Sequence, residues 1–95
     1  MDGEKVTIGL LDICNSKNPQ MLKSKILETP GQDIELDATD IDFIPTLVLQ
    51  TMLAASKQWQ ADNKHVSTIN LKSSVIKDIQ MLGLENSPLF AEVAK

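Results

Sequence analysis

The sequence predicts an α/β domain with a small, mixed, largely parallel β-sheet of three to four strands and three to four helices. Three segments with strand-like composition alternate along the chain with segments whose apolar residues recur at helical spacing. Strands that alternate with helices need crossover connections, which favour parallel pairing. With so few strands, we expect one face of the sheet to be open or covered by a partner. The length of 95 residues predicts a single domain over residues 1–95.

The first half of the chain predicts a strand, a helix and a second strand. Residues 5–13 are rich in β-branched and aliphatic side chains, which is typical of a strand. A turn-forming segment follows, in which Asn15, Ser16 and Asn18 are candidate helix caps and Pro19 suits a first helical turn. The Thr-Pro-Gly run at residues 29–31 ends this helix. Residues 33–39 then alternate between apolar and polar side chains, which predicts the second strand.

The longest helix is predicted over residues 46–61, where apolar side chains recur at helical spacing. Its expected inward stripe consists of Leu49, Met52, Leu53, Ser56 and Trp59 or Gln60. Residues 65–71 predict a third strand, with weaker alternation than the second.

Two further helices are expected after the third strand. Ser73 or Ser74 caps the first of them, and Gly83 ends it in the left-handed conformation. One face of this helix carries Val75, Ile76, Ile79 and Leu82. Pro88 opens the second, short helix. The apolar side chains that this short helix lays on the body are Leu89, Phe90 and Val93.

The charge composition excludes several classes of partner. Nine basic residues stand against thirteen acidic ones, the formal net charge is -4, and none of the basic residues is Arg. Such a chain has no obvious means of neutralising a phosphate backbone, so we expect no nucleic-acid partner. No apolar run approaches the roughly 20 residues that a membrane span needs, so we expect no direct membrane insertion.

We expect the protein to be cytoplasmic. The N-terminal residues begin acidic and show no basic segment before an apolar one, which is not the pattern of a signal peptide. The single cysteine, Cys14, cannot form an internal disulfide, and this suits a reducing compartment.

No residue set typical of catalysis comes together in the sequence, so we expect no enzyme activity, no cofactor and no metal. The single histidine, His65, is interpreted as a solvated surface residue, and Cys14 as a small buried one. The four glycines lie too far apart to build a phosphate-cradling loop. Asp37, Asp40 and Asp42 have the oxygen ligands that Ca²⁺ or Mg²⁺ prefers, but the rest of a cation loop is missing, which favours a charged connection.

The connection from the second strand into the long helix is the most informative location for function. Open α/β sheets bind ligands and partners at the carboxyl ends of their strands. Residues 43–48 occupy this position, and Thr46 is the one hydroxyl among otherwise apolar side chains. Thr46 is interpreted either as the helix cap or as a phosphoacceptor, because a helix N-terminus favours a phosphate. The apolar residues around it must be buried or contact a partner.

A set of residues along the chain shares the spacing of a known family. They are Asp37-Ala38-Thr39, Ile41, Phe43-Ile44, Leu49, Leu53, Val75 and Gly83-Leu84, with Leu11-Asp12-Ile13 upstream. In combination they resemble the STAS domain, which is named for sulfate transporters and anti-sigma factor antagonists. The resemblance covers residues 6–90 and implies a STAS-like fold that is trimmed at both ends.

The chain departs from the STAS pattern at the turn before the long helix. That family has a Phe-Ile-Asp-Ser-Ser-Gly-Leu turn, whose second Ser is phosphorylated by a partner kinase in anti-sigma factor antagonists. The position of that Ser is Leu47 here, while Pro45 replaces the Asp and Val48 replaces the Gly. The resemblance therefore implies that the phosphorylation switch is lost at Leu47, and Thr46, at the first Ser position, is the remaining candidate phosphorylation site.

The short start, Gln50 and Trp59 resemble the small STAS proteins that are encoded beside bacterial chemotaxis kinases. This resemblance implies a non-enzymatic protein-binding module. It would bind a chemotaxis histidine kinase, or a complex of kinase and response regulator, and modulate phosphotransfer. The residues expected to contact the partner are Pro45, Thr46, Leu47, Gln50 and Ala54.

Two alternatives stay open at this point. An anti-sigma factor antagonist would regulate transcription by binding an anti-sigma kinase, with any phosphate on Thr46. A STAS subunit of a lipid-transport ABC complex would pack against an ATPase, and some such subunits retain Thr at the position of Thr46.

Overall fold

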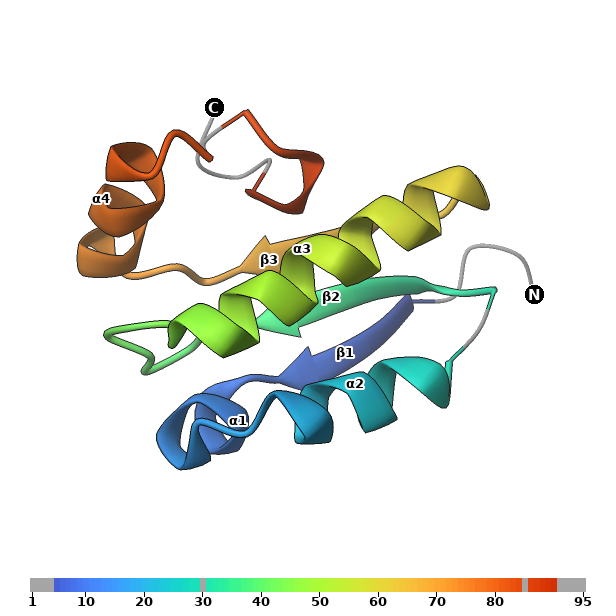
Figure 1. Cartoon of the computed structure of the whole chain (residues 1–95), viewed down its shortest axis with the longest axis horizontal. Coiled ribbons are helices and arrows are strands. Elements are labelled where there is room, and N and C mark those ends of the chain that lie inside the picture. Colours follow the sequence, from blue (N-terminus) through green and yellow to red (C-terminus); the bar gives the residue numbers. More distant parts are fainter. Residues whose placement is uncertain (1–4, 30, 85, 91–95) are drawn as a thin grey trace.

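Strands and helices alternate along the chain as the sequence predicts (Figure 1). The computed structural model describes residues 5–29, 31–84 and 86–90. The elements are β1 (Lys5–Gly9), α1 (Leu11–Ser16), α2 (Pro19–Leu27), β2 (Asp33–Asp37), α3 (Thr46–Ala61), β3 (Val66–Ile69), α4 (Ser73–Met81) and the 3₁₀ helix η1 (Pro88–Phe90). Among the described helices, none combines the length and the apolar composition that a membrane crossing requires.

The three strands form one sheet in the order β1-β2-β3, and both pairings are parallel. Each strand therefore lies beside its neighbour in the sequence. Figure 1 shows α2 and α3, the helices of the two crossovers, side by side on the same face of this sheet. The arrangement follows from the strand order, because two successive right-handed crossovers that step in the same direction place their helices on the same side.

One face of the sheet is packed under these helices. Its rows run from Val6 through Ile34 to Val66 and from Ile8 through Leu36 to Thr68. All of these side chains are buried except Val6, which is partly buried. Together with the inner sides of α2 and α3 they form the aliphatic core.

The opposite face of the sheet is open. Its rows run from Thr7 through Glu35 to Ser67 and from Gly9 through Asp37 to Ile69. None of these six residues is buried. An open face was one of the two outcomes expected for so small a sheet, and it is unusual for parallel strands, which are normally covered on both sides.

The expected strand over residues 5–13 is wrong after Gly9. Leu10 has helical backbone dihedrals and serves as the N-cap of α1, whose N–H at Cys14 donates to the carbonyl of Leu10 at 2.9 Å. Ser16 closes the helix by donating from Oγ to the carbonyl of Asp12 at 2.8 Å. The apolar run over residues 10–14 fits a strand and a helix equally well by composition, and tertiary packing decides between them.

Two helices begin where the sequence predicts. Asn18 caps α2, since its Oδ1 accepts a hydrogen bond from the backbone N–H of Gln20 at 3.1 Å, and Pro19 occupies the first turn. The long helix α3 has the predicted bounds, Thr46–Ala61. Its inward stripe is only partly as expected, because Val48 and Ala55 are buried with Met52, Ser56 and Trp59, while Leu49 and Leu53 are partly buried.

The helix α4 differs from the prediction at both of its termini. The N-cap of α4 is Lys72 and makes no side-chain cap, so the serine cap is wrong. Gly83 follows the helix with φ of +74°, as expected for a left-handed C-terminal residue. Leu82 is 61% exposed and does not belong to the buried face. In η1, Leu89 and Phe90 are buried as expected, whereas Val93 lies outside the described residues.

Asp37 joins the carboxyl ends of β2 and β3. Its Oδ1 accepts hydrogen bonds from the hydroxyl and the backbone N–H of Thr39 and from the side-chain amide of Asn70. The Thr39 hydroxyl, then the Asn70 amide and the Thr39 N–H, favour the charged carboxylate and lower its pKa. The folded protein therefore stabilises the ionised form of Asp37.

We expect Asp37→Asn to change how stability depends on pH. Because the folded pKa lies below the unfolded value of about 3.9, the stabilisation is complete above that value and is lost as the pH falls through the folded pKa. The free energy of unfolding, measured in urea between pH 2 and pH 7, should favour wild type over the variant by a constant amount near neutrality. That difference should shrink in acid. A difference independent of pH would contradict the assigned role.

A second prediction concerns Thr68, which is 1% exposed and whose hydroxyl has no hydrogen-bond partner among the described residues. Burying an unpaired hydroxyl is costly, so Thr68→Val should raise the free energy of unfolding by about 1 kcal/mol. The matched control is Thr7→Val, on the open face, where the effect should stay within about 0.5 kcal/mol. A less stable Thr68→Val protein would show that the hydroxyl is hydrogen-bonded in solution.

Candidate functional site

The connection between β2 and α3 is held on the body by two buried isoleucines, Ile41 and Ile44. On its outer side, the carboxylate of Asp42 forms a salt bridge with Lys72 at 3.0 Å, and its carbonyl accepts a hydrogen bond from the Ser74 hydroxyl at 3.2 Å. These contacts tie the connection to the start of α4. Phe43, between the anchors, is 58% exposed. The connection therefore presents an aromatic side chain to solvent from a fixed backbone.

Pro45 and Thr46 set the start of α3. Pro45 is the N-cap residue and makes no side-chain cap, while its carbonyl accepts from the N–H of Leu49 at 2.9 Å. The interpretation of Thr46 as a helix cap is therefore wrong, because Thr46 is the first residue within the helix. Thr46 is exposed, so its hydroxyl is accessible, whereas Pro45 is buried and offers little surface to a partner.

Three of the expected contact residues lie together. Leu47, Gln50 and Ala54 are exposed on α3 and line a groove between α2 and α3, with a volume of about 370 Å³. We call it the α2–α3 groove. Its α2 wall consists of Pro19, Gln20, Lys23, Ile26 and Leu27, and its α3 wall of Leu47, Gln50, Thr51, Ala54, Ala55, Gln58 and Trp59.

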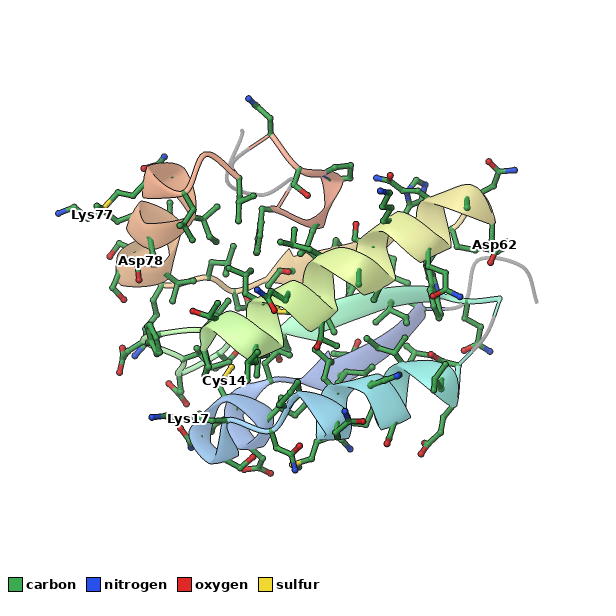
Figure 2. All side chains as sticks on the ribbon, viewed as in Figure 1. Cys14, Lys17, Asp62, Lys77 and Asp78 are labelled. Atoms are coloured by element: carbon green, nitrogen blue, oxygen red, sulfur yellow. The ribbon has the colours of Figure 1, made fainter. Side chains whose placement is uncertain are left out.

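Thr46 faces a different groove, between α3 and α4, with a volume of about 280 Å³. We call it the α3–α4 groove. Its lining also includes Phe43, Met81 and Leu82, which are all exposed, and the carboxylate-bearing Asp78. Figure 2 shows Asp78 and Lys77 on α4, at the end of the molecule where α3 begins. The expected contact residues are thus divided between two sides of the first turn of α3.

Sequence reasoning missed the apolar residues that complete these grooves. The sequence predicts Leu82 on the buried face of its helix, but Leu82 and also Leu27 on α2 are each 61% exposed. The apolar stripes of α2 and α4 are wider than the core can cover. The width of the apolar stripe on each helix is the one sequence signal that could have identified these exposed residues. This signal can be interpreted only when the surfaces that pack against the helix are known.

The other candidate residues do not gather into a site. No group of three or more potential metal ligands comes together within the described residues, and Asp37 and Asp42 are engaged in structural contacts. His65 is exposed, and its backbone N–H donates to Asp33 Oδ1 at 2.9 Å. Cys14 is buried beside the connection (Figure 2), and this burial raises the pKa of its thiol to about 11.

Comparisons of this chain with protein-family models, with curated proteins and with solved structures gave no match.

Proposed function

We propose that this protein is a non-enzymatic, STAS-like binding module of bacterial signalling, and that it binds a protein partner through the N-terminal half of α3. The observation that carries the proposal is the solvent exposure of the Leu47 side chain. Leu47 is 60% exposed on the first turn of α3 and lines the α2–α3 groove. The α3–α4 groove lies on the other side of the same turn. Apolar surface of this kind stabilises a complex by about 25 cal/mol for each Å² that becomes buried.

The first turn of α3 suits a permanent contact better than a reversible one. Leucine cannot accept a phosphate, and the resemblance to the STAS family aligns Leu47 with the serine that is phosphorylated in that family. Further exposed apolar side chains lie on the other side of this turn, where Phe43, Met81 and Leu82 line the α3–α4 groove. The partner favoured by the resemblance is a chemotaxis histidine kinase, alone or with its response regulator, whose phosphotransfer the bound protein would modulate.

We expect Leu47→Asp to weaken binding to the purified partner kinase by tenfold or more, because a charge would replace a central apolar contact. The matched control is Leu11→Asp, on α1, which changes an exposed leucine outside both grooves and should leave the affinity unchanged. Isothermal titration calorimetry measures the affinity, and circular dichroism checks that each variant is folded.

The double variant Leu47→Asp with Thr46→Glu tests whether the N-terminal half of α3 is the binding surface. Both substitutions introduce a carboxylate on the first turn of α3, one toward each groove. An affinity for the kinase that is unaltered in this double variant would exclude the N-terminal half of α3 as the binding surface.

A second candidate function, the anti-sigma factor antagonist, is favoured by one observation, the exposure of Thr46. A phosphate on this hydroxyl would lie at the N-terminus of a 16-residue helix, where the dipole favours negative charge. Under this function an anti-sigma kinase would be both the partner and the phosphate donor.

Mass spectrometry of the protein from its native cells tests this candidate. The tryptic peptide that ends at Lys57 should appear in a phosphorylated form with the phosphate on Thr46, and Thr46→Val should abolish it. Thr51→Val is the matched control, since the Thr51 hydroxyl is bonded to the carbonyl of Leu47 at 3.0 Å within the helix. Unmodified peptide under all growth conditions would leave the chemotaxis-type function as the surviving proposal.

A further inference from the structure

We propose that the occupant of the α2–α3 groove is an amphipathic helix of the partner that carries acidic residues beside its apolar face. This inference rests on the proposed function, since it specifies the chemistry of the partner that binds α3. Four features of the groove support it: its dimensions, its apolar lining, the charge of its two walls, and the repulsion that a second copy of the chain would meet.

The dimensions of the groove fit a helix. Its α2 wall begins at Pro19 and ends at Leu27, and nine helical residues span about 13 Å at a rise of 1.5 Å each. In Figure 1, α2 and α3 lie side by side and run in the same direction. A third helix laid between them would present apolar residues at positions i, i+4 and i+7, which cover about 11 Å.

The lining of the groove places large apolar side chains at its ends and small ones in its middle. Leu47 lies near the start of α3 and Leu27 at the end of α2, and both are about 60% exposed. Ala54 and Ala55 lie between them along α3 and line the groove. Small residues let a helix backbone approach closely, while the two leucines offer apolar contacts at either end.

The charges of the two walls select the partner. The segments α2 and α3 carry Lys23, Lys25 and Lys57, and neither contains Asp or Glu. Among the described residues, Lys23 is the one charged side chain in the lining of the groove, and Lys25 and Lys57 lie outside that lining. The chain as a whole has a formal net charge of -4. The charged side chains within the two helices are therefore all positive, with Lys23 in the groove itself, and an acidic segment would be attracted to this charge.

The same charges disfavour a second copy of this chain as the occupant. A two-fold dimer brings the same surface patch of both copies together, so Lys23 in the groove lining would meet a patch that carries the same positive charge. Within α2 and α3 no acidic residue would compensate it, and the acidic residues next to these helices are their C-caps, Glu28 and Asp62. Amide side chains at the edge of the groove, those of Gln20, Gln50 and Gln58, instead offer N–H donors to the carboxylates of a different partner.

The chain contains its own reporter for this groove. Trp59 is the single tryptophan, it lines the groove, and its Nε1 donates to the carbonyl of Gln32 at 2.7 Å. The probe is a Trp-free helical peptide with leucines along one face and glutamates on the remaining positions. A matched probe has lysine in place of every glutamate. Titration of each peptide into the intact protein, followed by Trp59 emission, measures its affinity.

We expect saturable binding of the glutamate peptide, with an affinity at least fivefold higher than that of the lysine peptide. Lys23→Glu should reduce the affinity for the glutamate peptide by about two- to fivefold. Lys77→Glu, on α4, makes the same change in net charge outside the groove and should have no effect. An equal or higher affinity for the lysine peptide would overturn the proposal. A change in Trp59 emission with anionic lipid vesicles, but with neither peptide, would overturn it as well.

Leu27→Asp separates this inference from the proposed function. Leu27 belongs to the α2 wall and not to α3. If Leu47→Asp weakens kinase binding and Leu27→Asp does not, the partner uses α3 without the groove, and the inference falls while the function stands. If Leu27→Asp abolishes peptide binding but neither substitution affects the kinase, the groove is confirmed and the kinase is the wrong partner.

Discussion

The parallel pairing of three strands in the order of the sequence is the constraint on which the rest of this structure depends. Each crossover steps in the same direction, so α2 and α3 lie on one face and meet along their lengths. Their contact creates the α2–α3 groove, and their absence from the other face leaves that face open. The strand order never reverses, so the sheet has no switch point at which doubly wound folds bind small ligands. The surfaces available for recognition are therefore the open face of the sheet and the outer sides of the helices.

Much of the fold was predictable because local signals agreed with tertiary packing. The alternation in β2 and the bounds of α3 follow from the local sequence pattern, and Asn18 is the one of the three candidate caps that begins α2. The failures occurred where local signals were ambiguous. After Gly9 the N–H of Leu10 still bonds to the carbonyl of Asp37 in β2 at 2.9 Å, and the chain then turns into α1. Periodicity alone does not contain that information.

The candidate site was predictable only where one helix supplies it. Leu47, Gln50 and Ala54 share a face of α3 because they are spaced by three and four residues, and the structure places them in one groove. Thr46 points to the other side for the same geometrical reason. Leu27 comes from a different helix, and no spacing in the sequence connects it with Leu47. The crossover geometry places both in the lining of one groove.

The burial of Cys14 has a practical consequence for studying this protein. A thiol reacts with maleimides and other alkylating labels as the thiolate, and a pKa of about 11 leaves very little thiolate near neutral pH. The native cysteine is therefore a poor competitor for such reagents. A second cysteine introduced on an exposed helical position would be labelled selectively, without first removing Cys14 and disturbing the packing of α1. Spin labels or fluorophores could then be placed on one helix at a time in the otherwise native chain.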